Sequence, residues 1–313
     1  MMSGTDKYNT LVVVTGATAS GKTALAIELA EHFNTEIISA DSRQLYRDIP
    51  IGTAAPTECE RSRVFHHLVG CLGLEDYYSA ALFETDALAI LKEIYKKSRV
   101  AVVCGGSMMY IDALCRGIDE MPTVSEPVRA YVLRLLNENG PVSVLAQLQI
   151  LDPVYYEEVD KANMRRVVHA VEICLEAGMP YSQLRTGNIK ERDFNIIKFA
   201  IEWPREELFA RINSRVDMMM NLGLEDEARR ALAKGSFNSL NTVGYKEMAA
   251  YFRDDMTRDE AIARIAKNTR VYAKKQLTWL KRDSDVIWLS PVDAFDRACS
   301  VIERKTASAS SHN

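Results

Sequence analysis

The most constraining feature of this 313-residue chain is a glycine-rich octapeptide near its N-terminus. Residues 16–23 match the pattern G-x-x-x-x-G-K-[ST] at every fixed position. A short β-branched run, Leu11 to Val14, precedes this segment, and an amphipathic stretch from Thr23 to Glu31 follows it, so it joins a strand to a helix. Backbone amides and a helix N-terminus in that context wrap an anion. The sequence therefore predicts a phosphate-binding loop made of Gly16, Ala17, Thr18, Ala19, Ser20, Gly21, Lys22 and Thr23.

Two side chains of this loop carry chemistry. Lys22 would neutralise phosphate oxygens, and the Thr23 hydroxyl would ligate Mg²⁺. Such a loop recognises a diphosphate, which leaves ATP, another nucleotide and a prenyl diphosphate open. The strand at Arg99 to Cys104 ends in Gly-Gly without a carboxylate, so Asp41 is the only acidic residue at a strand end close to the loop. Asp41 would hold the metal or activate an acceptor, or else only cap the following segment.

Short apolar runs alternate with helical stretches along most of the chain, which predicts an α/β fold with a mostly parallel sheet. Strands are expected at 36–40, 99–104, 195–201 and 286–289, and a helix at 79–97. Ligands of such sheets bind beyond the carboxyl ends of the strands. The phosphate loop, Asp41 and Ser107 all lie at those ends.

Helical patterns without strands fill the chain from Glu126 to about Arg185. This predicts a P-loop NTPase-like core, formed by residues 1–115 and 195–305, with an inserted all-helical domain at 116–194. The last residues, 306–313, are small and polar and are expected to be disordered.

Composition excludes several classes of protein. The chain has 39 Lys and Arg against 43 Asp and Glu, a net charge of −4, which excludes a bulk polycation. Its six cysteines form no C-x-x-C pair, and the His66-His67 pair lacks a third ligand, so these two histidines are expected to be packed or hydrogen-bonded. With no apolar run of membrane-spanning length, we expect a soluble cytoplasmic protein that binds no membrane.

One predicted helix, residues 258–282, is strongly basic. It has eight basic against two acidic side chains and opens with a capping box, Thr257 to Glu260. Ile262, Ile265, Tyr272 and Leu280 would form its apolar side. Such a stripe is typical either of a solvated face without a partner or of a surface that contacts nucleic-acid phosphates.

Several motifs occur in a specific order, and together they resemble the bacterial tRNA dimethylallyltransferase family. The resemblance covers roughly residues 11–289. Its motifs are the phosphate loop, Asp41-Ser-Arg-Gln-Leu-Tyr46, Ile51-Gly-Thr-Ala54, His66-His-Leu68, Tyr78-Ser-Ala80, Gly105-Gly-Ser-Met-Met-Tyr110, Val243-Gly-Tyr-Lys-Glu247 and Thr269-Arg-Val-Tyr-Ala-Lys-Lys-Gln-Leu-Thr-Trp279.

The resemblance implies transfer of a dimethylallyl group from dimethylallyl diphosphate to N6 of the adenosine 3′-adjacent to the anticodon of a tRNA. By the family pattern, Asp41 is the general base, and the Ser107 hydroxyl lies beside the reacting atoms. Lys22, Arg215 and Thr23 with Mg²⁺ would stabilise charge on the departing diphosphate. An adenine in an RNA loop must be unstacked to reach such a site.

The same resemblance implies which residues contact RNA, with the inserted domain as a clamp over the anticodon loop and the protein as a monomer. The implied tRNA contacts are Asp41, Ser42, Arg43, Gln44, Arg129, Arg165, Arg166, Val167, Val168, His169, Thr242, Val243, Gly244, Tyr245, Lys246 and Glu247.

Other functions stay open. An adenylate dimethylallyltransferase would share the loop and the base but act on AMP, ADP or ATP, and a small-molecule kinase would lack a second acidic partner. A catalytically reduced RNA-binding paralogue is suggested by departures from the family pattern. Ala55 stands where the family has lysine, Ser107 replaces threonine, and His169 occupies a position where arginine is frequent.

Overall fold

The computed structural model describes residues 8–308, which divide into two compact units. Among the described residues, the larger unit comprises residues 8–116 and 191–308, and the smaller one comprises Gly117–Lys190. The helical pattern of the sequence predicts the inserted domain at 116–194. Residues 191–194 fall in the larger unit because the Arg192 guanidinium donates to Leu114 O at 2.8 Å and Phe194 packs in that unit's core.

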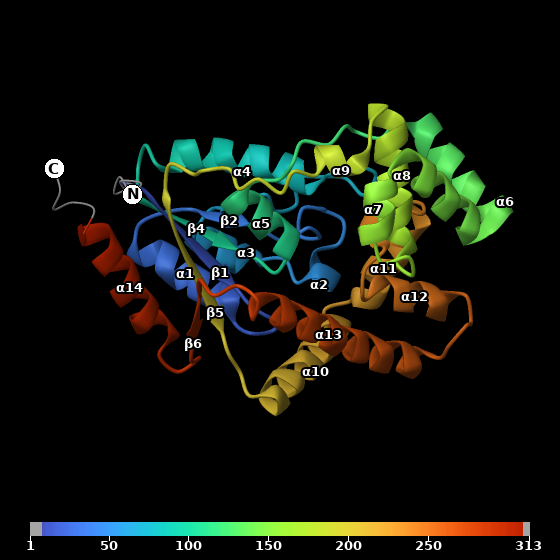
Figure 1. Ribbon diagram of the computed structural model, residues 1–313. Helices are drawn as coiled ribbons and strands as arrows, with labels where there is room; N and C mark the ends of the chain where they lie inside the picture. Colours follow the sequence, from blue (N-terminus) through green and yellow to red (C-terminus); the bar gives the residue numbers. More distant parts are fainter. Residues whose placement is uncertain (1–7, 309–313) are drawn as a thin grey trace. The chain divides into compact units, whose positions relative to one another are not determined.

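The larger unit is built on one six-stranded sheet whose described strands are all parallel (Figure 1). The strand order is β3-β2-β4-β1-β5-β6. The strands are β1 (Thr10–Thr15), β2 (Ile37–Ser39), β3 (His66–His67), β4 (Val100–Cys104), β5 (Asn195–Ile201) and β6 (Val286–Leu289). Every residue of β1 is buried, because the strand lies between β4 and β5 and both faces are covered.

Successive residues of β1 face opposite layers of helices, as strand geometry requires. Leu11 and Val13 belong to the core shared with α4 (Ala80–Ile94) and α5 (Met108–Arg116), whereas Val12 and Val14 pack with α1 (Lys22–His32) and α14 (Ala294–Ser308). Figure 1 shows these pairs of helices on the two sides of the sheet. The first core also includes residues of α11 (Leu224–Ala233), α12 (Tyr245–Phe252) and α13 (Arg258–Leu280).

The carboxyl ends of β1, β2 and β4 meet at one edge of this sheet, because these three strands are neighbours in the order β2-β4-β1. Gly16 follows β1, Asp41 follows β2 and Gly105 follows β4. Gly105 must be glycine here, since a Cβ at this position would overlap the carbonyl of Ala40. The sheet order therefore brings together the segments that the sequence singles out.

The smaller unit is helical, as the sequence predicts. It contains α6 (Glu126–Leu151), α7 (Pro153–Glu158), α8 (Met164–Ala177) and α9 (Tyr181–Leu184) around a core that includes Val132, Val144 and Leu148. A kink interrupts α6 at Gly140, which has a φ of 78° and precedes Pro141. Asp152 is fully buried, and its carboxylate accepts from Tyr155 N and from the amide and hydroxyl of Ser182.

Some elements escape the sequence patterns because they are short or lack a clear period. These are β3, α2 (Pro50–Thr53), α3 (Glu58–Arg63), α5 and the 3₁₀ turn η1 (Asn238–Leu240). At the other end of the chain, α14 continues through Ser308, so residues 306–308 of the expected disordered tail are helical. The Thr306 hydroxyl donates to Ile302 O at 3.0 Å there, and residues 309–313 lie outside the described part. Within residues 8–308, no helix is long and apolar enough to cross a membrane.

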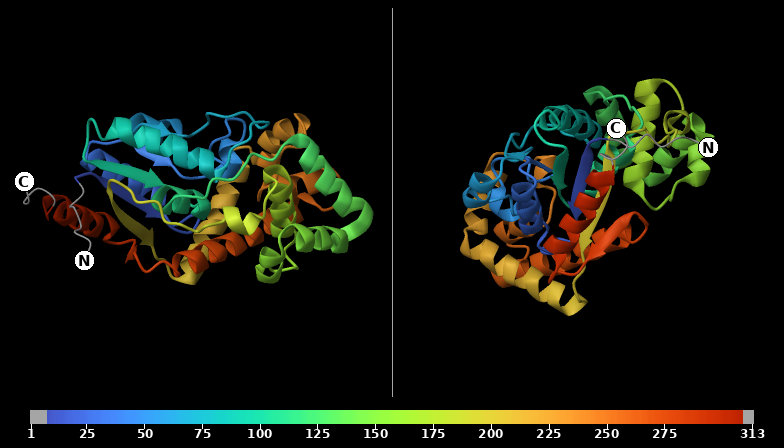
Figure 2. Two further views of the ribbon diagram at one scale, coloured as in Figure 1. Left: turned by 45° about the horizontal axis from the view of Figure 1, so that its top comes forward. Right: turned by 90° about the vertical axis from the view of Figure 1, so that its left-hand side faces the viewer.

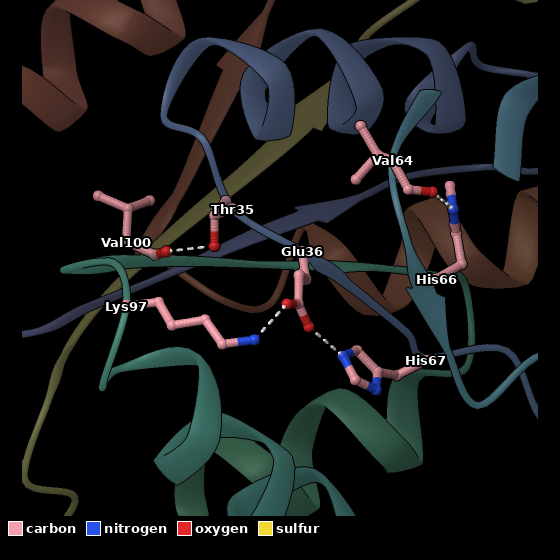
Figure 3. A network of polar contacts seen from close by, with 7 residues as sticks. All are labelled: Thr35, Glu36, Val64, His66, His67, Lys97 and Val100. Carbon is pink, nitrogen blue, oxygen red and sulfur yellow. Dashed lines mark hydrogen bonds and ion pairs between the residues drawn. The ribbon is translucent and has the colours of Figure 1, made fainter. Parts of the chain in front are cut away.

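The His66-His67 pair is hydrogen-bonded, as predicted, and lies at the β3 edge of the sheet (Figure 3). His67 Nε2 contacts Glu36 Oε2 at 2.6 Å, and Lys97 Nζ donates to Glu36 Oε1 at 3.2 Å. His66 Nδ1 donates to the carbonyl of Val64 at 2.8 Å, while its Nε2 is buried without a hydrogen-bond partner among residues 8–308. Because a protonated Nε2 would be a buried donor without an acceptor, this ring is neutral.

This buried ring predicts a pH dependence of stability. Burial lowers the pKa of His66 below its ordinary value, so the unfolded chain binds this proton at a higher pH than the folded chain does. The free energy of unfolding should therefore fall as the pH is lowered from about 6.5. His66→Asn, which keeps a donor for Val64 O, should flatten urea-denaturation stabilities between about pH 7.5 and about pH 5. The exposed His32→Asn variant should keep the wild-type slope; an equally steep slope in His66→Asn would contradict the assignment.

Candidate active site

The phosphate loop leaves β1 and enters α1 with three residues in left-handed conformations. Gly16, Ala19 and Gly21 have φ values of 140°, 64° and 95°. Gly16 also leaves no room for a side chain, since a Cβ would lie 3.0 Å from the Ser20 hydroxyl. That hydroxyl is buried without a hydrogen-bond partner among residues 8–308. Gly21 is the N-cap of α1 without a side-chain cap, so the first amides of the helix stay available for an anion.

Side chains from the C-terminal part of the chain hold this loop. Gln276 of α13 accepts from Thr18 N at 2.9 Å, and Arg215 of α10 (Arg205–Asn221) donates to the Thr18 hydroxyl at 3.0 Å. A further pair binds loop carbonyls: Arg211 donates to Ala19 O and Trp203 Nε1 donates to Ser20 O, each at 2.8 Å. The sequence patterns did not predict Trp203, Arg211 and Gln276 as site residues. Only Gln276 could have been suspected, because it falls within the motif 269–279.

Two cations and one carboxylate face one another beside the loop. Burial lowers the pKa of Lys22, and the positive charge of the Arg215 guanidinium lowers it further. Cys104 and Asp41 act to raise this pKa. Burial likewise lowers the pKa of Arg215, and Asp41 again acts in the opposite direction. Lys22, Asp41 and Arg215 are thus within electrostatic reach of one another. This arrangement places two cations and a carboxylate beside the phosphate loop.

Asp41 and Ser107 lie at the ends of neighbouring strands and are joined through one turn. Asp41 Oδ1 accepts from Arg43 N at 3.0 Å, an Asx turn with no helix to cap, and the carboxylate makes no other hydrogen bond with the described residues. Ser107 Oγ accepts from Ser42 N at 2.8 Å, which leaves its hydroxyl hydrogen for a ligand. Its own backbone amide donates to Ala40 O at 3.1 Å. The structure therefore brings the predicted base and the predicted hydroxyl to the same side of the loop.

Thr23 is the residue predicted to bind Mg²⁺. It lies half-buried in the first turn of α1, with its hydroxyl hydrogen-bonded to Cys104, whose pKa burial raises to about 11. In the described part of the chain, no three His, Cys, Asp or Glu side chains are grouped as metal ligands. Mg²⁺ binds commonly through one or two protein oxygens together with substrate phosphates. The Thr23 hydroxyl beside the loop suits that mode of binding.

The segment after Asp41 is fixed by its own side chains. Gln44 Nε2 donates to Ala54 O at 3.0 Å and its Oε1 accepts from Ser39 at 3.1 Å, so the amide of this predicted RNA contact already has protein partners. Arg43 donates to Asn238 O at 3.1 Å. Ser42 and Arg43 are half-buried. Their present contacts hold the turn that carries Asp41.

Residues 242–247 divide into buried and accessible positions. Tyr245 is fully buried and Glu247 is 5% exposed, so their side chains are not available to touch RNA, in contrast to the expectation. Tyr245 donates to the buried carboxylate of Glu227 at 2.5 Å, and Glu247 accepts from Gly244 N at 2.8 Å. Glu227 also accepts from Ile51 N and Gly52 N at the start of α2. Thr242 and Val243 are half-buried, Gly244 is buried and Lys246 is exposed.

Removing the Tyr245 hydroxyl should destabilise the protein. Tyr245→Phe leaves the buried Glu227 carboxylate without one of its donors, which should lower the free energy of unfolding by about 2 kcal/mol in urea denaturation. Tyr251→Phe on the same helix is the matched control, because that half-buried hydroxyl has no hydrogen bond with the described residues. Equal effects of the two variants would show that the hydroxyl contributes nothing specific.

The remaining predicted RNA contacts lie in the smaller unit. Arg165, Arg166 and His169 are exposed on α8, Val168 is half-buried, and Arg129 is half-buried on α6. Val167 is fully buried in the core of this unit, which contradicts a contact between its side chain and RNA. On an amphipathic helix, a residue between two exposed arginines and an exposed histidine falls on the core side.

The basic helix forms as α13, with the predicted capping box at Thr257. Ile265 and Leu280 are buried and Ile262 is half-buried, but Tyr272 is 42% exposed and does not belong to the apolar side. Near the end of the helix lies a groove of about 290 Å³, lined by Val271, Lys274, Lys275, Thr278, Trp279 and Arg282. Exposed cations beside an indole ring suit both phosphates and bases of single-stranded RNA.

Comparisons with known proteins agree with this geometry. A family model described as IPP transferase matches residues 44–283. The chain belongs to the IPP transferase family. This family member is 52% identical over 283 residues to tRNA dimethylallyltransferase 2 of Parabacteroides distasonis, which covers 90% of this chain and 95% of that protein.

Solved structures also resemble this IPP transferase family member. The full-length tRNA isopentenylpyrophosphate transferase of Bacillus halodurans is 31% identical with a TM-score of 0.71, and the match covers 97% of this chain and 99% of the other. A eukaryotic dimethylallyltransferase acting on tRNA shares the fold with a TM-score of 0.81 at 24% identity, covering 96% and 80% of the two chains.

Proposed function

We propose that this chain transfers the dimethylallyl group of dimethylallyl diphosphate to the exocyclic N6 of the adenosine immediately 3′ to the anticodon of tRNA. The allylic carbon–oxygen bond breaks, a carbon–nitrogen bond forms, a proton leaves the amine, and diphosphate is released. The observation that carries the proposal is the position of Asp41, a carboxylate that follows β2 beside the phosphate loop and lies within electrostatic reach of the half-buried cations Lys22 and Arg215. The names of the relatives support the same reaction.

The residues of this chain would divide the reaction between them. The loop amides, Lys22 and Arg215 bind the diphosphate and stabilise the charge that develops as it leaves. Asp41 accepts the N6 proton, and the Ser107 hydroxyl donates to the bridging oxygen. Mg²⁺ held by Thr23 would neutralise further charge on the diphosphate oxygens.

The RNA would be held by positions that the structure leaves accessible. These include Arg165, Arg166, Lys246 and the exposed cations of α13. Val167, Tyr245 and Glu247 would act indirectly, by shaping the elements that carry those contacts. A cytoplasmic monomer acting on the anticodon loop fits this arrangement, because one chain supplies both the base and the cations.

The proposal is tested by mass analysis of nucleosides after the protein is incubated with Mg²⁺, dimethylallyl diphosphate and unmodified tRNA, and in parallel with AMP or ATP. Prenylated adenosine formed only from tRNA is the expected result. Prenylated free nucleotide would identify an adenylate dimethylallyltransferase instead. Absence of product in both reactions would contradict the transferase function and direct attention to Ala55 and Ser107.

A further inference from the structure

A buried glutamine joins two loops of the site. Gln276 lies on α13, is 2% exposed and makes two hydrogen bonds, both to backbone groups. Its Oε1 accepts from Thr18 N at 2.9 Å, and its Nε2 donates to Gly106 O at 3.0 Å. The side chain therefore bridges the phosphate loop and the loop that follows β4.

Only a carboxamide satisfies both partners. A backbone N–H can only donate and a backbone carbonyl can only accept, so the amide has one possible orientation. A carboxylate could accept from Thr18 N but could not donate to Gly106 O, and an aliphatic side chain could do neither. The approach is close: a Cβ at position 106 would lie 2.4 Å from Gln276 Nε2, so a side chain there would displace the amide.

The two bridged loops carry different groups of the proposed reaction. Thr18 belongs to the loop that would bind the leaving diphosphate, and Arg215 holds its hydroxyl. Gly106 precedes Ser107, whose hydroxyl accepts from the amide next to Asp41. A shift of one loop against the other would change the distances from the bound diphosphate to the Ser107 hydroxyl and to Asp41.

We propose that Gln276 is a positioning residue, whose amide fixes the phosphate loop at the correct distance from Ser107. The effect of Gln276 on diphosphate binding depends only on the shape of the phosphate loop. The effect of Gln276 on prenyl transfer rests on the proposed function. Small displacements of reacting groups are costly in rate, because the catalytic contribution of orientation depends on near-attack geometry.

The test compares Gln276→Leu with a control on the same helix. Leu280 is also buried on α13, but it packs against Ala200 and Val286 and not against either loop. Pyrophosphate binding with Mg²⁺, measured by calorimetry, should weaken about ten- to a hundredfold in Gln276→Leu, because Thr18 N loses its acceptor and the loop its anchor. Leu280→Ala should bind pyrophosphate as the wild type does, even if its midpoint of thermal unfolding falls as much or more.

Gln276→Glu separates the two hydrogen bonds. This variant keeps an acceptor for Thr18 N, but it places a carboxylate oxygen against the carbonyl oxygen of Gly106. Transfer should therefore remain impaired. A double-mutant cycle with Ser107→Ala tests whether the two residues are coupled in catalysis, which a merely structural role of Gln276 would not require. If Gln276 acts through the Ser107 loop, the losses in kcat of the two single variants should not add in the double variant.

The outcomes separate this inference from the proposed function. Wild-type affinity for pyrophosphate in Gln276→Leu would overturn the inference, as would equal losses in Gln276→Leu and Leu280→Ala or additive losses with Ser107→Ala. A wild-type protein that binds pyrophosphate but forms no prenylated adenosine would contradict the proposed function. The pyrophosphate affinities of the variants would still decide the role of Gln276.

Discussion

Asp41→Asn is expected to lower kcat for prenyl transfer about a thousandfold while the affinity for tRNA changes less than about threefold. The amide of asparagine is isosteric with the carboxylate and can keep the hydrogen bond from Arg43 N through its oxygen, so the turn should be preserved. It cannot accept the N6 proton. Single-turnover transfer of a radiolabelled dimethylallyl group measures the first effect, and fluorescence anisotropy of a labelled anticodon stem-loop measures the second.

Asp48→Asn provides a control for this variant. Asp48 lies in the same segment and pairs with the exposed Lys234 at 2.7 Å, away from the loop. Its replacement should leave transfer unchanged. A loss of tRNA binding in Asp41→Asn as large as the loss of transfer would contradict its role as a general base.

Lys22→Met should lower kcat about a hundred- to a thousandfold and weaken pyrophosphate binding in parallel. Lys22 is half-buried at the start of α1, where an ammonium interacts with phosphate more strongly than in bulk water. Because burial lowers the pKa of Lys22, the cation is lost as the pH rises through that lowered value. Wild-type affinity for pyrophosphate should therefore decline at a pH below the ordinary lysine value of about 10.4.

The alkaline decline also separates Lys22 from other cations. Lys22→Met should bind pyrophosphate weakly at all pH values, without that decline, whereas Lys234→Met should behave as the wild type because Lys234 is exposed and pairs only with Asp48. Calorimetric titrations over a series of pH values measure both effects. An unchanged affinity in Lys22→Met would show that the Lys22 ammonium contributes nothing to diphosphate binding.

The sheet was predictable because its strands are short, apolar and separated by helical patterns. Apolar runs at 99–104 and 195–201 match β4 and β5 closely. The edge strand β3 was not predictable, since two histidines carry no apolar period, and their pairing with β2 depends on tertiary contacts. Helix α5 was missed because it is short, with nine residues, and begins almost directly after a Gly-Gly turn.

The candidate site was predictable where a motif has a fixed spacing and not where residues meet only through folding. The octapeptide at residues 16–23 predicts the phosphate loop, and the position of Asp41 at a strand end predicts that it belongs to the site. Nothing in the sequence says that Trp203 and Arg211 hold the loop carbonyls, because they lie more than 180 residues away. The burial of Tyr245 was equally unpredictable: it is followed directly by Lys246, as an exposed RNA contact could be, yet its side chain is fully buried.

The dependence of the phosphate loop on α10 and α13 has a consequence for synthesis. The loop residues leave the ribosome before Arg215 and Gln276, which hold Thr18 and follow about 200 and about 260 residues later. At 5–20 residues per second, that delay is on the order of ten seconds or longer. During this interval the nascent chain has the loop sequence but not the contacts that shape it, so a competent diphosphate site should arise only late in translation.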